Sequence, residues 1–285
     1  MVAITASMVK ELRERTQVGM MDCKKALVTA QGDMELAIEN LRKSSGLKAA
    51  KKAGRIASDG LVGIQVAEDS SLGVMVEVNC ETDFAARDEN FTAFVQTVVD
   101  RVFKSRETSI EALLPTGLES ERESLVQKIG ENISIRRAEV YSDPDVYSYV
   151  HTNSKIGVLL SMEGGDRILG RDLAMHIAAV EPLVLNPSDV PEDVIARERE
   201  IYTAQAGDSG KPPEIAAKMI EGKLRKYMAD ISLTEQPFVK DSNIRVGALL
   251  KKANARVTGF VRYEVGEGID KGPDDFAAEV AAQLS

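Results

Sequence analysis

The sequence has no tryptophan, and it contains only two cysteines and two histidines among 285 residues. Cys23 and Cys80 are too few for a disulfide framework or a cysteine-based zinc site, so we expect two buried thiols. His151 and His176 leave few candidates for acid–base or metal chemistry, and none of the common hydrolase, dinucleotide-binding or P-loop motifs occurs. These absences disfavour an enzyme and a resident metal or cofactor.

Long hydrophobic runs are also missing. No segment approaches the roughly 20 consecutive apolar residues of a membrane span, and residues 1–7 lack the basic and apolar regions of a signal peptide. The net charge is −9, from 36 basic and 45 acidic residues, which opposes general attraction to nucleic acid or to anionic lipid. We therefore expect a cytoplasmic protein that binds neither membranes nor nucleic acid directly.

Residues 1–55 differ in charge from the rest of the chain, because they contain eleven Lys or Arg and only six Asp or Glu. Apolar residues spaced three and four apart predict three short helices. A three-helix domain of this size and loop spacing is typical of ubiquitin-associated domains. We expect the last helix to end near Lys43 and residues 48–54 to form a basic linker. The predicted helices start near Ile4, at Met21 and at Asp33, with Asp33 as an N-cap.

Residues 56–141 and 142–265 show the same order of predicted elements, which is two strands, then helices, then a closing strand. This repetition predicts an α+β fold whose core consists of two related subdomains that arose by duplication. The predicted strands are 61–66, 74–78 and 133–140 in the first and 147–151, 156–162 and 255–265 in the second, and the main helices are 91–102, 120–129, 166–180 and 246–254.

An insertion at about 187–231 interrupts the second subdomain. Two segments in it, 191–206 and 215–228, are highly charged and carry only narrow apolar stripes. Such helices bury little surface alone. We therefore expect an antiparallel coiled-coil hairpin that projects from the core and contacts a second copy of the chain.

The segment from Asn79 to Phe84 follows a predicted strand, and it has two interpretations. In one, Thr82 or Asp83 caps a helix and Phe84 joins the core seven residues before Phe91. In the other, the long helix begins later and Phe84 lies exposed on a turn, where a large aromatic side chain can anchor a partner.

A second candidate segment begins at Gly19, where Met20 and Met21 precede a helix that carries Lys24. Exposed methionines suit an adaptable contact surface. The alternative is that one methionine lies in the core and the lysines are merely solvated. No aromatic platform for base stacking accompanies the positive charge, which disfavours RNA binding.

Three further positions have ordinary structural interpretations. Gly130, which follows Ile129, is explained as a glycine just past a helix C-terminus. His151 ends a predicted strand, and His176 lies beside apolar residues on a predicted helix. Neither histidine has a partner at ligand or catalytic-triad spacing.

Five segments together resemble the translation elongation factor Ts family, and the resemblance is collinear over almost the whole chain. The segments are Val9-Lys-Glu-Leu-Arg-Glu-Arg-Thr16, Gly19-Met-Met-Asp-Cys-Lys-Lys-Ala-Leu27, Glu77-Val-Asn-Cys-Glu-Thr-Asp-Phe84, Lys128-Ile-Gly-Glu-Asn-Ile133 and Thr258-Gly-Phe-Val-Arg-Tyr-Glu-Val-Gly-Glu-Gly268. The resemblance implies a guanine-nucleotide exchange factor for elongation factor Tu. It implies that Phe84 inserts into the partner's G domain near the elements that position Mg²⁺, so that Mg²⁺ and GDP are displaced.

The resemblance also implies which other residues contact elongation factor Tu. Lys240 occupies a position that is often apolar in relatives, so an apolar contact with the partner is not expected at this position. The implied contact residues are Thr82, Asp83 and Phe84 of the turn, Arg13, Met20, Met21 and Lys24 of the head, Ile129, Gly130 and His151 of the core, and the pair Phe238 and Val239.

The implied fold has a ubiquitin-associated-like head, two core halves, a coiled-coil arm and a C-terminal helical module at 266–285 with a helix from Asp274 to Leu284. The implied assembly is a homodimer or a 2:2 complex. Two alternatives stay open. One is a protein- or RNA-binding adaptor without exchange activity, and the other is a thiol or histidine enzyme using Cys80 or His151.

Overall fold

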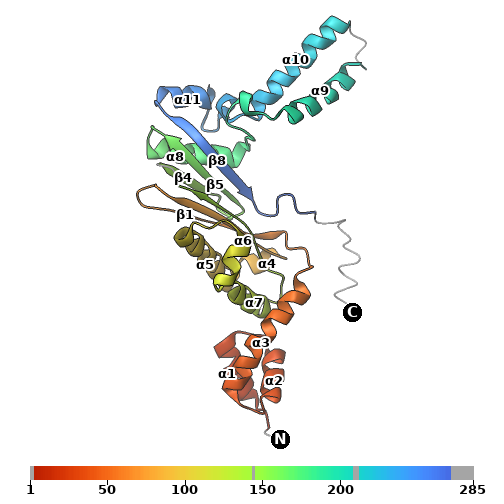
Figure 1. Ribbon diagram of the computed structural model, residues 1–285, viewed down its shortest axis with the longest axis vertical. Coiled ribbons are helices and arrows are strands. Elements are labelled where there is room, and N and C mark those ends of the chain that lie inside the picture. Colours follow the sequence, from red (N-terminus) through yellow and green to blue (C-terminus); the bar gives the residue numbers. More distant parts are fainter. Residues whose placement is uncertain (1–2, 143–144, 208–211, 271–285) are drawn as a thin grey trace. The chain divides into compact units, whose positions relative to one another are not determined.

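The computed structural model describes residues 3–142, 145–207 and 212–270, and its elements are drawn in Figure 1. They fall into two compact units. Unit 1 takes in residues 3–65, 74–140 and 263–270, and unit 2 takes in residues 66–73 and most of 141–262. Helices and small sheets occur in both units, so the chain has the predicted α+β composition.

Unit 1 begins with three helices around a small core of their own. The side chains of Leu12, Cys23 and Leu27 are fully buried in it. Asp33 caps the third helix as predicted, because its Oδ1 accepts a hydrogen bond from the Leu36 N–H at 2.9 Å. The helices are α1 (Ala6–Thr16), α2 (Met20–Thr29) and α3 (Met34–Lys52).

The prediction of a basic linker at residues 48–54 was wrong, because α3 continues to Lys52. Ala49 is 1% exposed and belongs to the main core of unit 1, so the last turns of α3 are anchored by packing. Gly46 lies close to the later helix α7 (Leu118–Ile129), since a Cβ at position 46 would lie 2.8 Å from Glu123 Oε1. Alanine and lysine are strong helix formers, and they extend the helix where the apolar pattern weakens.

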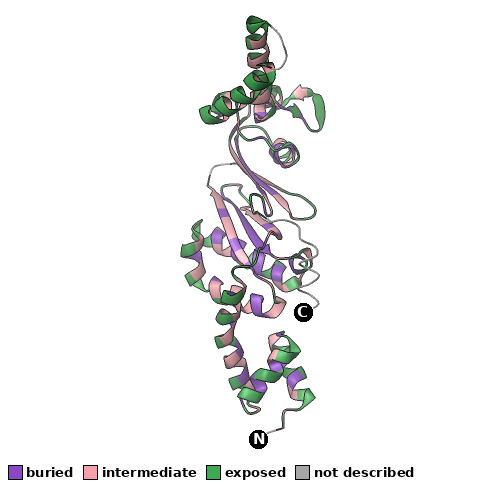
Figure 2. Ribbon diagram, turned by 90° about the vertical axis from the view of Figure 1, so that its right-hand side faces the viewer, coloured by how far each residue is buried: buried purple, intermediate pink, exposed green. Residues whose placement is uncertain are grey.

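The remainder of unit 1 is a three-stranded sheet, in the order β1-β2-β3, packed against helices. Strand β2 is buried along its whole length. The predicted apolar face of the long helix α5 is confirmed, and Phe91, Val98 and Val102 of this face are fully buried. Figure 2 shows buried residues along the strands and many exposed residues on the helices. The elements are β1 (Asp59–Val66), β2 (Gly73–Cys80), α4 (Asp83–Ala86), α5 (Glu89–Ser105), α6 (Ile110–Leu113), the 3₁₀ turn η1 (Leu114–Thr116), α7 (Leu118–Ile129) and β3 (Ser134–Tyr141).

Unit 2 contains a second three-stranded sheet, in the order β4-β5-β8. The first two strands pair antiparallel, with Val146 opposite Ser161 and Val150 opposite Gly157. As in unit 1, the middle strand comes second in the chain and the closing strand follows the helices. The elements are β4 (Val146–Val150), β5 (Ile156–Glu163), α8 (Arg167–Val180), α11 (Val246–Lys252) and β8 (Arg256–Glu264).

The predicted insertion forms two helices that lie side by side (Figure 1). No residue of α9 is buried, and Leu224 is the buried residue of α10, which agrees with the narrow apolar stripes. The sequence did not predict the short hairpin that follows. The elements are η2 (Pro187–Asp189), α9 (Glu192–Gly207), α10 (Pro213–Asp230), η3 (Leu233–Glu235), β6 (Pro237–Phe238) and β7 (Asp241–Arg245). The predicted C-terminal helix at 274–284 lies outside the described residues.

Candidate partner-binding site

Phe84 lies on a short helix of its own between β2 and α5. Thr82 caps that helix, with its Oγ1 accepting from the Ala85 N–H at 3.3 Å. Asp88 then caps α5 separately, so the chain turns between Phe84 and Phe91. Phe84 is 79% exposed. The first interpretation was correct that Thr82 caps a helix but wrong that Phe84 joins the core. The second interpretation, in which the long helix begins later and Phe84 is exposed, was correct on both points.

Two carboxylates join this turn to the loop that follows α7. Glu131 Oε2 accepts from the N–H groups of Glu81 and Thr82 at 3.0 and 2.9 Å, and its Oε1 accepts from the Thr82 hydroxyl at 2.6 Å. In return, Glu81 Oε1 accepts from the Asn132 N–H at 2.5 Å. We call these four residues, Glu81, Thr82, Glu131 and Asn132, the reciprocal clamp. It fixes the backbone from which Phe84 projects.

Asp83 stabilises the same turn from its exposed side. Its Oδ2 accepts from Arg87 Nη2 at 2.7 Å across one helical turn, and both side chains are largely open to solvent. Ala85 and Ala86 are buried beneath. The short helix α4 therefore presents Phe84 outward while its alanine face packs inward.

The reciprocal clamp brings the segment containing Ile129 and Gly130 next to this turn. Gly130 ends α7 with a φ of 87° and donates its N–H to Val126 O at 2.9 Å, as the helix C-terminus interpretation predicts. Its carbonyl accepts a hydrogen bond from Lys52 of α3. Ile129 is half-buried against the core of unit 1.

The candidate residues of the head are all exposed. Met20 and Met21 are 53% and 64% exposed at the start of α2, so the interpretation in which one of them enters the core was wrong. Arg13 and Lys24 are also exposed. A flexible thioether surface flanked by cations is suited to contact with a protein partner.

Two further candidates lie in unit 2. His151 is exposed, one residue beyond the end of β4, and its Nδ1 lies 3.2 Å from Tyr149 Oη. Val239 is 45% exposed, whereas Phe238 is 7% exposed and packs within the core of unit 2. The ring of Phe238 is therefore placed to support the β6–β7 turn, and Val239 is the member of the pair open to a partner.

His176 holds the backbone at Val239. Its Nδ1 accepts from the Val239 N–H at 3.2 Å, and its Nε2 lies 3.0 Å from Gln236 Oε1. Burial lowers the pKa of His176, while the hydrogen bond to Gln236 acts in the opposite direction. The neutral ring with its proton on Nε2 satisfies both contacts, so His176 has the structural role that was expected. Lys240, beside Val239, pairs with Asp172 at 2.6 Å.

Cys23 and Cys80 are both buried and are not joined in a disulfide. Residues 3–142, 145–207 and 212–270 contain no group of three His, Cys, Asp or Glu placed to hold a metal ion. No helix in the same part of the chain is long and apolar enough to cross a bilayer.

Phe84, Met20 and Met21 are exposed apolar side chains, of the kind that protein partners commonly bury. The model of the family described as Elongation factor TS matches residues 81–267. The chain therefore belongs to the elongation factor Ts family.

Several curated relatives match the chain from end to end. It is 60% identical over 284 residues to Elongation factor Ts of Hahella chejuensis (strain KCTC 2396), covering 100% of this chain and 99% of that protein. It is 55% identical to Elongation factor Ts of Saccharophagus degradans, with 100% and 99% coverage, and 53% identical to that of Marinobacter nauticus, with 99% and 98%. The similarity thus includes the head, which the family model does not reach.

Proposed function

We propose that the protein is a guanine-nucleotide exchange factor for elongation factor Tu and acts during translation elongation in the cytoplasm. Phe84 inserts into the partner's G domain, displaces Mg²⁺ and GDP, and allows GTP to bind. The observation that carries this proposal is the 79% exposure of Phe84 on a turn held by the reciprocal clamp. Exposure of a phenylalanine side chain to water is unfavourable in free energy. A backbone that is already fixed in the binding conformation loses little entropy when the ring inserts into a partner.

Exchange of this kind needs neither a catalytic side chain nor a cofactor of the factor's own. Mg²⁺ and GDP hold each other in a nucleotide site because the metal neutralises phosphate charge while the protein fixes its remaining ligands. Displacing Mg²⁺ therefore weakens the binding of GDP, and displacing GDP weakens the binding of Mg²⁺. By linkage, GDP weakens binding of the factor by the same ratio as the factor weakens binding of GDP, so incoming GTP completes the cycle.

Phe84 supplies only part of the required free energy. Burial of one phenylalanine is worth about 1.5–3 kcal/mol, which corresponds to roughly one to two powers of ten in an equilibrium constant. A wider surface must supply the rest. We assign this surface to three groups of residues, with Phe238 supporting Val239 from the core. They are Arg13, Met20, Met21 and Lys24 of the head, Thr82, Asp83, Ile129 and Gly130 around Phe84, and His151 and Val239 of unit 2.

We further propose that the three N-terminal helices are a ubiquitin-associated-like domain and that the two sheets derive from a duplication. The arm formed by α9 and α10 would pair two copies into a homodimer or a 2:2 complex with elongation factor Tu. Ile201 is 43% exposed and Ile215 is 50% exposed on these helices. The absence of buried residues on α9 leaves apolar surface for a second chain.

The test is stopped-flow release of a fluorescent GDP analogue from elongation factor Tu. We expect Phe84→Ala to slow the accelerated release about tenfold to a hundredfold, in line with the burial of one ring, while the fold is unchanged. Leu183→Ala is the matched control, because Leu183 is a similarly exposed apolar residue (62%) in unit 2. If GDP release with Phe84→Ala were as fast as with wild type, Phe84 would have no part in the mechanism. A wild-type protein that binds elongation factor Tu without accelerating release would favour the adaptor alternative.

A further inference from the structure

Helix α3 belongs to two cores of unit 1. Ala37 and Leu41 are buried in the small core of the head, formed by α1, α2 and α3. About two turns later, Ala49 is buried in the main core, which includes the strand that leads to Phe84. Because α3 is one unbroken helix of 19 residues, it joins the head to the rest of unit 1 as a helix and not as a linker.

Lys48 of α3 contacts the helix that carries the exposed methionines. Its Nζ lies 2.6 Å from Asp22 Oδ2, and the two side chains are 31% and 38% exposed. Asp22 directly follows Met20 and Met21 at the start of α2. A partly buried ion pair is screened by salt less than a fully exposed one. This pair therefore fixes α3 against the methionine-bearing end of α2.

Lys52 lies one turn beyond Lys48, about 6 Å farther along the helix axis. Its Nζ donates a hydrogen bond to Gly130 O. This carbonyl lies just past the end of α7, where the helix dipole favours a cation. The next residue is Glu131 of the reciprocal clamp, which accepts from the Thr82 hydroxyl at 2.6 Å. The end of α3 therefore holds the loop that carries half of this clamp.

Asn132 connects the same two segments through a buried side chain. It is 6% exposed, and its Nδ2 donates to Arg55 O at 2.8 Å and to Ala53 O at 3.5 Å. Its backbone N–H donates to Glu81 Oε1, and Arg55 Nη1 lies 3.6 Å from Glu81 Oε2. We call Lys52, Arg55 and Asn132 the head anchor. It ties the chain that leaves α3 to the reciprocal clamp.

We propose that the head anchor holds the methionine surface of the head and the ring of Phe84 as one preorganised surface for elongation factor Tu. This inference rests on the proposed exchange function and goes further by assigning Lys52 and Asn132 as positioning residues, which act through the turn that carries Phe84. Once the head has bound, a flexible linker would let the ring sample a volume set by the length of the linker. The head anchor removes that search, and less conformational entropy is lost when the ring inserts.

Hydrogen exchange measured by mass spectrometry on the isolated full-length protein tests the head anchor. We expect Lys52→Met and Asn132→Ala each to speed exchange in residues 81–86 about threefold to tenfold, because each removes hydrogen bonds that restrain this turn. Lys51→Met is the matched control, because Lys51 is the exposed neighbour of Lys52 on α3. Exchange within α5 should stay at the wild-type rate in every variant, which shows that the core remains folded.

Stopped-flow release of a fluorescent GDP analogue, measured over a range of factor concentrations, tests the positioning role. We expect Lys52→Met to lower the maximal release rate about threefold to tenfold and to leave the half-saturating concentration unchanged, because the contact residues of the head are intact. Lys52→Arg keeps a donor for Gly130 O and should restore the rate. In a Phe84→Ala background, Lys52→Met should have no further effect, because no ring remains to be positioned.

Wild-type hydrogen-exchange rates at residues 81–86 in both Lys52→Met and Asn132→Ala would overturn the proposal. Equal slowing of GDP release by Lys52→Met with and without Phe84 would also overturn it, because the lysine would then act on the fold in general. If the wild-type protein did not accelerate release at all, the proposed exchange function would fail. Hydrogen exchange would still decide whether the head anchor holds the turn, since that measurement uses no nucleotide and no partner.

Discussion

Glu131 accepts both the hydroxyl and the backbone N–H of Thr82, at 2.6 and 2.9 Å, across 49 residues of sequence. Thr82 simultaneously caps the helix that carries Phe84. The carboxylate at the end of α7 therefore positions the exposed ring without touching it. In the proposed mechanism, Glu131 is a positioning residue.

Glu131→Ala should weaken exchange by loosening the turn. It removes three hydrogen bonds, and we expect about 1–3 kcal/mol of lost stability near the turn and roughly tenfold slower GDP release at saturating factor. The readouts are hydrogen exchange of residues 81–86 and the fluorescent GDP assay.

Glu121→Ala, which changes an exposed glutamate on α7, the helix that precedes Glu131, serves as the control for Glu131→Ala. If Glu131→Ala loosened the turn but GDP release stayed at the wild-type rate, the rigidity of the turn that carries Phe84 would be unimportant for exchange. Unchanged hydrogen exchange would show instead that the clamp does not hold the turn.

Substitution of the exposed methionines should affect binding and leave folding intact. Met20→Asp and Met21→Asp introduce a charge where a partner would bury the thioether, so we expect affinity for elongation factor Tu to fall about tenfold or more in calorimetry. Thermal stability should change by less than about 0.5 kcal/mol, because both side chains are exposed. Val28→Asp, at the other end of α2 and 58% exposed, is the control. Equal affinities for all four proteins would remove this part of the head from the interface.

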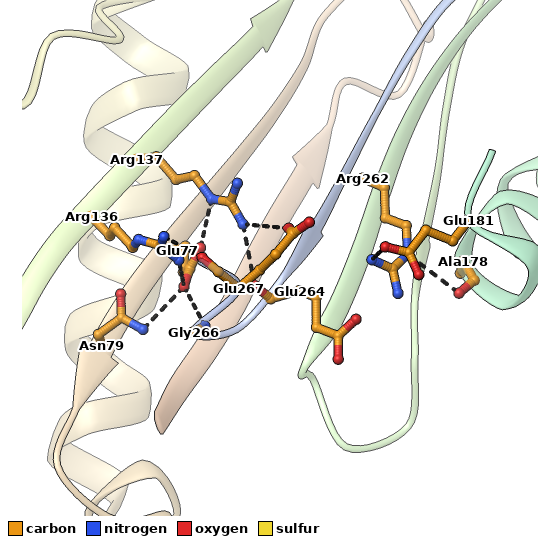
Figure 3. Close-up of polar contacts among 10 residues, drawn as sticks. All are labelled: Glu77, Asn79, Arg136, Arg137, Ala178, Glu181, Arg262, Glu264, Gly266 and Glu267. Carbon is orange, nitrogen blue, oxygen red and sulfur yellow. Dashed lines mark hydrogen bonds and ion pairs between the residues drawn. The ribbon is translucent and has the colours of Figure 1, made fainter. Parts of the chain in front are cut away.

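The buried carboxylate of Glu77 on β2 accepts hydrogen bonds from Arg136 and Arg137 (Figure 3), and this arrangement predicts a response to acid. Burial opposes ionisation of Glu77, yet the hydrogen bonds from Gly266, Asn79, Arg137 and Arg136 outweigh it and lower its pKa below the ordinary 4.5. Because the folded-state pKa is the lower one, this stabilisation is complete above pH 4.5 and is lost as the pH falls through the folded-state value.

Glu77→Gln should therefore destabilise the protein at pH 7 and flatten the acid limb of the stability curve. Removing the charge takes away the buried anion that Arg136 and Arg137 share, although Arg137 keeps Glu267 at 3.4 Å. Breaking a buried pair costs about 3–5 kcal/mol. Urea unfolding between pH 3 and pH 7 measures both effects. An acid limb identical to that of wild type would show that other carboxylates control acid unfolding.

The long periodic elements were predictable because one physical pattern dominates each of them. The six apolar residues of α5 recur at helical spacing, and all of them are buried. The end of α3 was not predicted, because Ala49 lies in a lysine- and alanine-rich segment whose composition is typical of a linker. Only the structure shows that Ala49 packs into the core of unit 1. Packing against residues distant in the sequence therefore decides where α3 ends, and the local sequence pattern does not.

The exposed residues of the candidate site were predictable from the sequence, but the residues that hold the turn in place were not. Phe84, Met20 and Met21 were recognisable as apolar residues in polar surroundings near turns. Glu131 and Glu81 look like ordinary surface carboxylates in sequence, and their role depends on two loops 49 to 51 residues apart lying together. The one available signal was that the segments containing them are both among the family-like motifs.

Strand β2 carries Glu77 near its middle and leads directly to Thr82, and each of its residues is buried. Side chains alternate faces along a strand, so inserting or deleting one residue between these two positions would turn either the anion or the cap toward the wrong side. This stretch must then keep its length through evolution even where residue identities drift. Length variation among homologues should instead collect at the tip of the arm.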